Sequence, residues 1–295
     1  MKPQTNTATL VESQLLGEVT SPELSGSVYT VTRDGLPFVP VGCGGIHYNV
    51  TVGMPVFGWA ADQAQPGVSL ENPDPAANVG LSVFACVGNR AVVRSGPAAG
   101  AVGVVTGKHE QFDTFQHVLV DFPQPVIELL VPGDKVAIAS VGVGLQIPEL
   151  PSVTFHSLGP QLWERWAVAM VGGRLEVPVV VTLPPQLVGI GSGRVSAATS
   201  LALQLPDRQT ARDVGADDLR IGDIVAVRDW DGRYATGYRR GSLLVGVIVH
   251  GASRLPGHGP SITILASARD GAIVPAHDPA ANLARLLMAG TGRAL

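Results

Sequence analysis

Residues 219–266 concentrate side chains that can transfer protons or hold a cation. The apolar run IVAVRD ends at Asp229, and Asp231 follows two residues later. Two carboxylates at a strand end suit a hard cation or acid/base chemistry, but the same pattern also forms an Asx turn on a solvated hairpin. Tyr238 and Arg239 come next, and a guanidinium group at this place favours anion binding.

Two histidines follow on the next strand and its loop. The run LLVGVIVH is almost wholly apolar and ends at His250, whereas His258 stands between two glycines and before a proline. Such a constrained loop can aim one side chain at a site, although a single histidine at a strand end is often a hydrogen-bonded rim residue. We predict that both histidines share a pocket with Asp229 and Asp231, although antiparallel pairing of their strands would separate Asp229 from His250.

The N-terminal half offers a second pair of titratable residues. Lys108 and His109 follow a glycine in GVVTGKHEQ. They can act as an acid/base pair or hold an anion, or they can lie in a solvated turn. We expect them to enter the same pocket from the other half of the chain. Cys43, in GCGG, is a weak candidate nucleophile because no paired histidine motif accompanies it.

These residues must be positioned by many short strands. Of 295 residues, 36 are Gly and 23 are Pro, and they separate Val-rich runs. This pattern predicts a mainly β fold with two barrel- or sandwich-like units and a few short helices. We place a barrel-like domain at residues 1–155 and a β domain at residues 156–295. The second domain contains two short helices, at 160–170 and 279–289. The predicted strands of the first domain include the runs IHYNVTV, LSVFACV, AVGVVTG and HVLVDF.

Composition excludes several classes of protein. A net charge of −4 and only 5% aromatic residues argue against nucleic-acid binding, which needs a basic groove with stacking platforms. No apolar run reaches the roughly 18 residues of a membrane helix, so we expect a cytoplasmic protein without membrane contact. A mean hydropathy of +0.27 with 15% charged residues favours a homo-oligomer. The two cysteines form no zinc-thiolate pattern, and no nucleotide-cofactor or serine-hydrolase motif is present.

The order of the short motifs resembles one known family. The runs LRIGDIVAVRDWDGRYATGY, GVIVH and GHGP resemble the C-terminal part of the domain of unknown function 4438 family. The similarity extends upstream through GGIHYNVTVG, QPGVS, VGNRAVVRSG, GVVTGKH, HVLVDF and LEVPV, so it spans roughly residues 38–268. It implies a mostly β, two-part molecule and an N-terminal part associated with single-stranded DNA. It brings no agreed reaction.

This chain also departs from the family pattern. Ionisable residues of that pattern are neutral or reversed in charge here, at Gln63, Gln65 and Arg90. The changes favour weak or absent binding of any divalent metal held by those groups in other members. From the resemblance we add Asn49 and Asp62 to Tyr238 and Arg239 as substrate-binding residues. The candidate residues that match the family pattern are Asn49, Asp62, Lys108, His109, Asp229, Asp231, Tyr238, His250 and His258.

The sequence thus favours an enzyme that acts on a small molecule with acid/base residues. A lyase, a cyclase or a hydrolase would suit these residue types, with or without a divalent metal. A divergent member could also serve in a specialised biosynthesis. Two alternatives stay open: a module that binds single-stranded nucleic acid, and a non-catalytic oligomeric scaffold.

Overall fold

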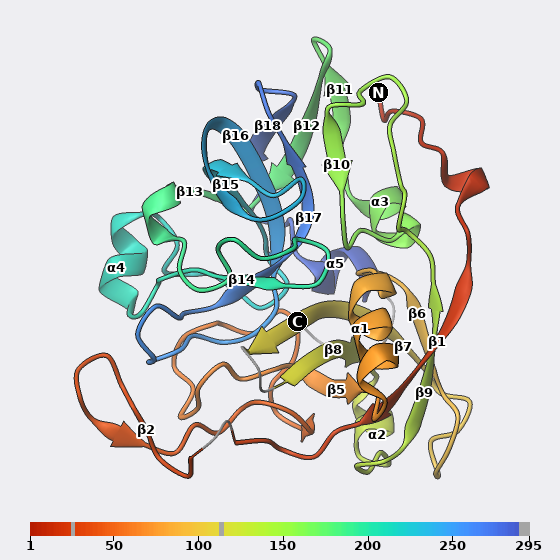
Figure 1. Cartoon of the computed structure of the whole chain (residues 1–295), viewed down its shortest axis with the longest axis vertical. Coiled ribbons are helices and arrows are strands. Elements are labelled where there is room, and N and C mark those ends of the chain that lie inside the picture. Colours follow the sequence, from red (N-terminus) through yellow and green to blue (C-terminus); the bar gives the residue numbers. More distant parts are fainter. Residues whose placement is uncertain (25–26, 112–114, 289–295) are drawn as a thin grey trace.

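The computed structural model describes residues 1–24, 27–111 and 115–288, and it is built mainly from strands (Figure 1). Its first sheet closes on itself because β1 pairs with both β9 and β5. This confirms the predicted barrel. The strands of the barrel, in order around it, are β1 (Ser13–Val19), β9 (Lys135–Ser140), β6 (Arg90–Val93), β7 (Val102–Gln111), β8 (Phe115–Asp121) and β5 (Gly67–Glu71), and β4 (Ile46–His47) adds to β5.

The second half contributes two further sheets, which lie above the barrel in Figure 1. The larger runs in the order β10 (Val153–Phe155), β17 (Ser261–Ala268), β16 (Gly237–Ile248), β15 (Ile224–Asp231) and β13 (Val181–Leu183), with β14 (Ser200–Ala202) also on β17. The smaller is β11 (Ala169–Val171), β12 (Arg174–Val179) and β18 (Ile273–His277). A separate hairpin consists of β2 (Thr30–Val31) and β3 (Pro37–Phe38).

Helices are short, as predicted. The described residues form the α-helices α1 (Pro75–Phe84), α2 (Gln124–Ile127), α3 (Pro160–Arg165), α4 (Arg208–Asp213) and α5 (Leu283–Leu287) and the 3₁₀ turns η1 (Thr7–Thr9) and η2 (Pro185–Leu187). The predicted helices at 160–170 and 279–289 correspond to the shorter α3 and α5, and residue 289 lies outside the described residues. None of the helices in the described part is both long enough and apolar enough to cross a membrane.

Two predicted strands are wrong. LSVFACV begins inside α1, because the Asp74 side chain accepts the Ala77 N–H at 2.8 Å and Pro75 occupies the first helical position. The apolar run is therefore the last turn of a helix, in which Leu81 is buried and Phe84 is exposed, followed by the buried loop residues 85–87. In IHYNVTV only Ile46 and His47 pair as strand, and the chain then turns, so Asn49 is exposed.

Strand β7 joins the two halves. The backbone N–H of Lys108 donates to Thr263 Oγ1 at 2.8 Å, and that hydroxyl donates back to the Lys108 carbonyl at 3.0 Å. At Gly107 a Cβ would collide with the Val249 side chain, so only glycine permits this close approach. One hydrophobic cluster lies within the barrel, and a larger one fills the second half and reaches outer barrel residues such as Leu119. The interface between the halves is therefore tightly packed.

Candidate functional site

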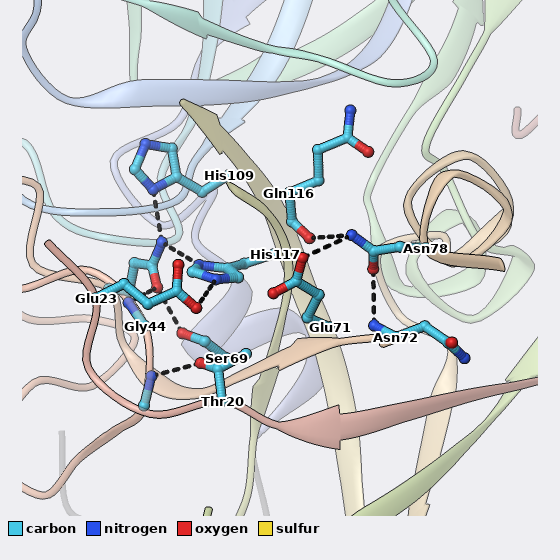
Figure 2. Close-up of polar contacts among 12 residues, drawn as sticks. Thr20, Glu23, Gly44, Ser69, Glu71, Asn72, Asn78, His109, Gln116 and His117 are labelled. Atoms are coloured by element: carbon cyan, nitrogen blue, oxygen red, sulfur yellow. Dashed lines mark hydrogen bonds and ion pairs between the residues drawn. The ribbon is translucent and has the colours of Figure 1, made fainter. Parts of the chain in front are cut away.

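A buried amide, Gln65, lies just before β5 and hydrogen-bonds to Gly44, Ser69 and two histidines. Figure 2 shows the polar network to which His109, His117 and Ser69 belong. Gln65 Oε1 accepts the Gly44 N–H at 2.9 Å and the Ser69 hydroxyl at 2.5 Å. Its Nε2 lies 2.7 Å from His109 Nδ1 and 3.2 Å from His117 Nδ1. One side chain thus connects two histidines from adjacent strands.

The amide also determines where both histidines carry their protons. The Gly44 N–H can only donate, so the atom that faces it must be the Gln65 oxygen. Gln65 Nε2 then donates its two hydrogens, and both rings accept at Nδ1. In a neutral imidazole the proton is then on Nε2. His109 and His117 are therefore both Nε2–H tautomers.

His117 connects this amide to two carboxylates. Its ring is fully buried, and its Nε2 lies 3.4 Å from Glu23 Oε1, whose side chain is 29% exposed. Glu71 lies beside them, and the ligand atoms of the three residues all lie within 4.8 Å of one another. Burial raises the pKa of Glu71, and the charge of Glu23 raises it further, whereas His117 opposes the shift. Glu71 thus favours its protonated form more than an exposed glutamate does.

His109 meets His250 on the opposite side of the network. Their ring centroids are 4.0 Å apart, and the rings are tilted by 46°. His250 Nδ1 lies 2.7 Å from the Gly251 carbonyl, which can only accept, so this nitrogen carries the proton. His250 Nε2 is then a bare acceptor, buried and without a hydrogen-bond partner among the described residues. The two rings therefore present a donor Nε2–H and an acceptor Nε2.

Burial keeps these two rings uncharged. It lowers the pKa of His250 to about 4, an effect that the Gly251 carbonyl partly offsets and His258 increases. Burial also lowers the pKa of His109 well below its usual value, and the neighbouring His250, His117 and His258 add to the effect. Both imidazoles are neutral at pH 7.

Asp62 and His258 border the same region. The Asp62 carboxylate is 2% exposed and accepts the Arg254 N–H at 2.7 Å and the Ser253 hydroxyl at 3.0 Å. Burial raises its pKa, against the effect of these hydrogen bonds and of the nearby His258. His258 is half-buried. A pocket of about 310 Å³ opens here, and its lining includes Trp59, Arg208, Ala252, Ser253 and Arg254.

The comparisons place most of the chain in one family. Residues 29–164 match the N-terminal part, and residues 165–287 the C-terminal part, of the domain of unknown function DUF4438. The chain belongs to the DUF4438 family. A crystal structure of a protein called TM1086 is similar to it, with 36% sequence identity and a TM-score of 0.91 over 96% of this chain and 99% of that one. No curated protein matches. Our division of the DUF4438 chain at residue 155 stays a prediction.

In this DUF4438 member four of the predicted site residues come together. His109, His250, His258 and Asp62 lie around the junction of the barrel and the second sheet. Their roles in binding or turnover stay predictions.

The predicted grouping of Asp229 and Asp231 with His250 is wrong. Strands β15 and β16 pair antiparallel, so Asp231 lies opposite Gly237 at one end of the hairpin and His250 follows the other end. Asp229 has a φ of 52° at a bulge and accepts the Gly241 N–H at 2.7 Å. Asp231 forms an ion pair with Arg233 at 2.7 Å. Both aspartates thus shape the hairpin.

The predicted grouping of Lys108 with His109 is also wrong. Adjacent residues on a strand point to opposite faces, so Lys108 turns away from the histidines. Its Nζ donates to the carbonyls of Val83 at 3.2 Å and Ala197 at 3.1 Å, and burial lowers its pKa to about 8. Lys108 therefore links the end of α1 to the second half.

The remaining predicted residues are at the surface or inert. Tyr238 is 65% exposed, and Arg239 and Asn49 are also exposed, so none of them belongs to the buried network. Cys43 and Cys86 are buried thiols that form no disulfide, and burial raises the pKa of both, which opposes a nucleophilic role.

Sequence reasoning missed Gln65, His117, Glu23 and Glu71. A signal for His117 was present, because it pairs directly with His109 across β7 and β8, two strands that the sequence predicts. Cross-strand neighbours share a face of the sheet, so the register would have placed both rings together. Glu23 precedes the family match and lies in an irregular segment, where periodicity carries no information.

Proposed function

We propose that this protein is an enzyme that moves protons on a small molecule, with His250 as general base and His109 as general acid. The observation that supports this most directly is the complementary protonation of two neighbouring neutral rings. His250 offers a bare Nε2 that can accept a proton, and His109 offers an Nε2–H that can donate one.

The low pKa values of the two rings define the type of chemistry. A neutral imidazole can donate its N–H to the negative oxygen that develops on the substrate. The bare nitrogen of the neighbouring neutral ring can accept the proton that the substrate loses. Proton abstraction next to a carbonyl group is a step in lyase and cyclase reactions, and the same pair can activate water in a hydrolase. These three reaction classes stay open.

The pocket beside Asp62 favours an anionic substrate. Its volume of about 310 Å³ fits a small molecule. Arg208 and Arg254 line it together with the indole of Trp59 and with Asp207, whose carboxylate pairs with Arg33 at 2.8 Å. The Arg254 guanidinium is held 4.1 Å from the centroid of the Phe38 ring. A small molecule with a carboxylate or phosphate group and a planar apolar part suits this lining.

Exchange of substrate protons with solvent tests the proposal. The purified protein would be incubated in D₂O with a fraction of cellular small molecules and followed by mass spectrometry. We expect at least one compound to gain deuterium or be converted, and His109→Gln and His250→Asn to abolish this. His277→Gln, at an exposed histidine outside the candidate site, is the matched control. If the wild type, all variants and heat-inactivated protein gave equal compound profiles, the proposal that this protein is an enzyme would be refuted.

A module that binds single-stranded nucleic acid is the alternative proposal. The observation that favours it is the small closed barrel formed by the N-terminal half. The net charge of −4 opposes it. Titration with labelled single-stranded oligonucleotides at two salt concentrations distinguishes the two proposals, because salt-dependent binding would favour this alternative.

A further inference from the structure

The group formed by Glu23, Glu71 and His117 has the composition of a metal site. Two carboxylates and an imidazole offer ligand atoms that all lie within 4.8 Å of one another. Such a set suits a divalent transition-metal ion, provided that the imidazole nitrogen facing the ion carries no proton. We infer that Gln65 prevents this and makes the group hold protons instead. The inference does not depend on the proposed reaction.

The Gln65 amide has a fixed direction. The Gly44 N–H at 2.9 Å and the Ser69 hydroxyl at 2.5 Å both donate to Gln65 Oε1. The amide nitrogen therefore faces His117 Nδ1 at 3.2 Å as a donor. His117 must accept there and carry its own proton on Nε2, which is the nitrogen that faces Glu23.

Metal binding would force two donors against each other. An ion on His117 Nε2 displaces the proton to Nδ1, which then faces the N–H of Gln65. Rotating the amide does not help, because its nitrogen would then face the Gly44 N–H. The His117 ring and the Gln65 amide are both buried, so no water can come between the two facing N–H donors.

Without a metal the same contacts form a proton-sharing group. His117 Nε2 lies 3.4 Å from Glu23 Oε1, which is close enough for an electrostatic contact. Glu71 lies beside both, and the Asn78 amide donates to its Oε1 at 3.2 Å. Gln65 is thus a positioning residue that selects a proton over a metal ion at this group.

A single change of nearly equal shape should reverse the selection. In Gln65→Glu, one carboxylate oxygen still accepts from Gly44 and Ser69, while the other accepts an N–H from His117 Nδ1. His117 Nε2 is then bare and faces Glu23 and Glu71. Outer residues that orient a ligand histidine typically change metal affinity by about 10–100-fold.

Calorimetric titration of the full chain with MnCl₂ and with ZnCl₂ tests the inference. We expect Gln65→Glu to bind about 10–100-fold more tightly than the wild type. Adding His117→Gln to this variant should remove the gain. Gln116→Glu is the matched control, because it adds the same charge next to His117 but on the opposite face of β8. Wild-type affinity equal to that of Gln65→Glu, or an equal gain in Gln116→Glu, overturns the inference.

A second measurement decides the case even if Gln65→Glu does not fold. The ¹⁵N spectrum of the wild-type histidines distinguishes a protonated ring nitrogen from a bare one. We expect His117 to carry its proton on Nε2, and a proton on Nδ1 overturns the inference. Neither measurement needs a substrate. Failure of this inference can therefore be distinguished from failure of the proposed enzyme activity in the D₂O experiment.

Discussion

The imidazoles of His109 and His250 come from different halves of the chain, yet their centroids lie 4.0 Å apart. His109 is on β7 of the barrel, and His250 follows β16 of the second sheet. Each ring is held by its own half, His109 through Gln65 and His250 through the Gly251 carbonyl. The candidate site therefore exists only when the two halves are packed together.

Removing the acceptor nitrogen of His250 should abolish turnover without unfolding the protein. In His250→Asn the side-chain amide can still donate to the Gly251 carbonyl, whereas the position of Nε2 is lost. We expect the rate with the compound found in the D₂O experiment to fall by about 10²–10⁴-fold. The melting temperature should change by only a few degrees. A rate within tenfold of the wild type would show that His250 is not the base.

The close contact at Gly107 should be intolerant of any side chain. A methyl group there would collide with Val249, so we expect Gly107→Ala to lower the free energy of unfolding by about 1–3 kcal/mol. Gly237→Ala is the control, because a Cβ at that strand position meets open space. Its effect should stay within about 0.5 kcal/mol. Chemical denaturation measures both, and equal effects would contradict the tight interface.

Lys108 should make stability depend on alkaline pH. Burial lowers its pKa to about 8 from the usual lysine value of 10.5, so between these values the unfolded chain binds more protons than the folded one. The free energy of unfolding should therefore rise with pH from about 8 to 10.5, by roughly 3 kcal/mol at most. Lys108→Met should lack this rise. Identical pH profiles for the two proteins would show that Lys108 titrates normally when folded.

We also expect a homo-oligomer, and the hairpin of β2 and β3 is the proposed contact. This hairpin lies at the edge of the molecule in Figure 1, and Arg33 at its turn pairs with Asp207 at 2.8 Å. Its exposed apolar side chains include Val28, Tyr29, Val31 and Leu36, each more than half exposed. Sedimentation at micromolar concentration should give more than 30.5 kDa for the wild type. A shift toward monomer is expected for Tyr29→Ser with Leu36→Ser, and a monomeric wild type would refute the proposal.

Much of the fold could be predicted because turns and strand patterns are local. The turns at Gly133-Asp134 and Gly222-Asp223 show this. Asp134 accepts the Val131 N–H at 3.0 Å and Asp223 accepts the Arg220 N–H at 2.7 Å, three residues earlier in each case. The strands β9 and β15 follow these two turns directly. The helix α1 was missed because its apolar run was read without its cap at Asp74.

The site was harder to predict because it depends on pairing between distant segments. Asp229 and His250 both end apolar runs, but the antiparallel register sends their ends apart. Lys108 and His109 are neighbours in sequence, but the pleat of β7 points them to different faces. Gln65 and Glu23 carry no chemical signal on their own. Their meaning comes from His117, which the fold brings to both.

The protonation of His109 and His250 is the most direct test of the proposed acid/base pair. A ¹⁵N histidine spectrum of the full chain, followed from pH 8 to pH 5, measures it without a substrate. We predict that His109 carries its proton on Nε2 and His250 on Nδ1, and that both stay neutral over this range because burial lowers their pKa values. A His250 ring that carries its proton on Nε2, or that titrates near pH 6.5, would contradict the account.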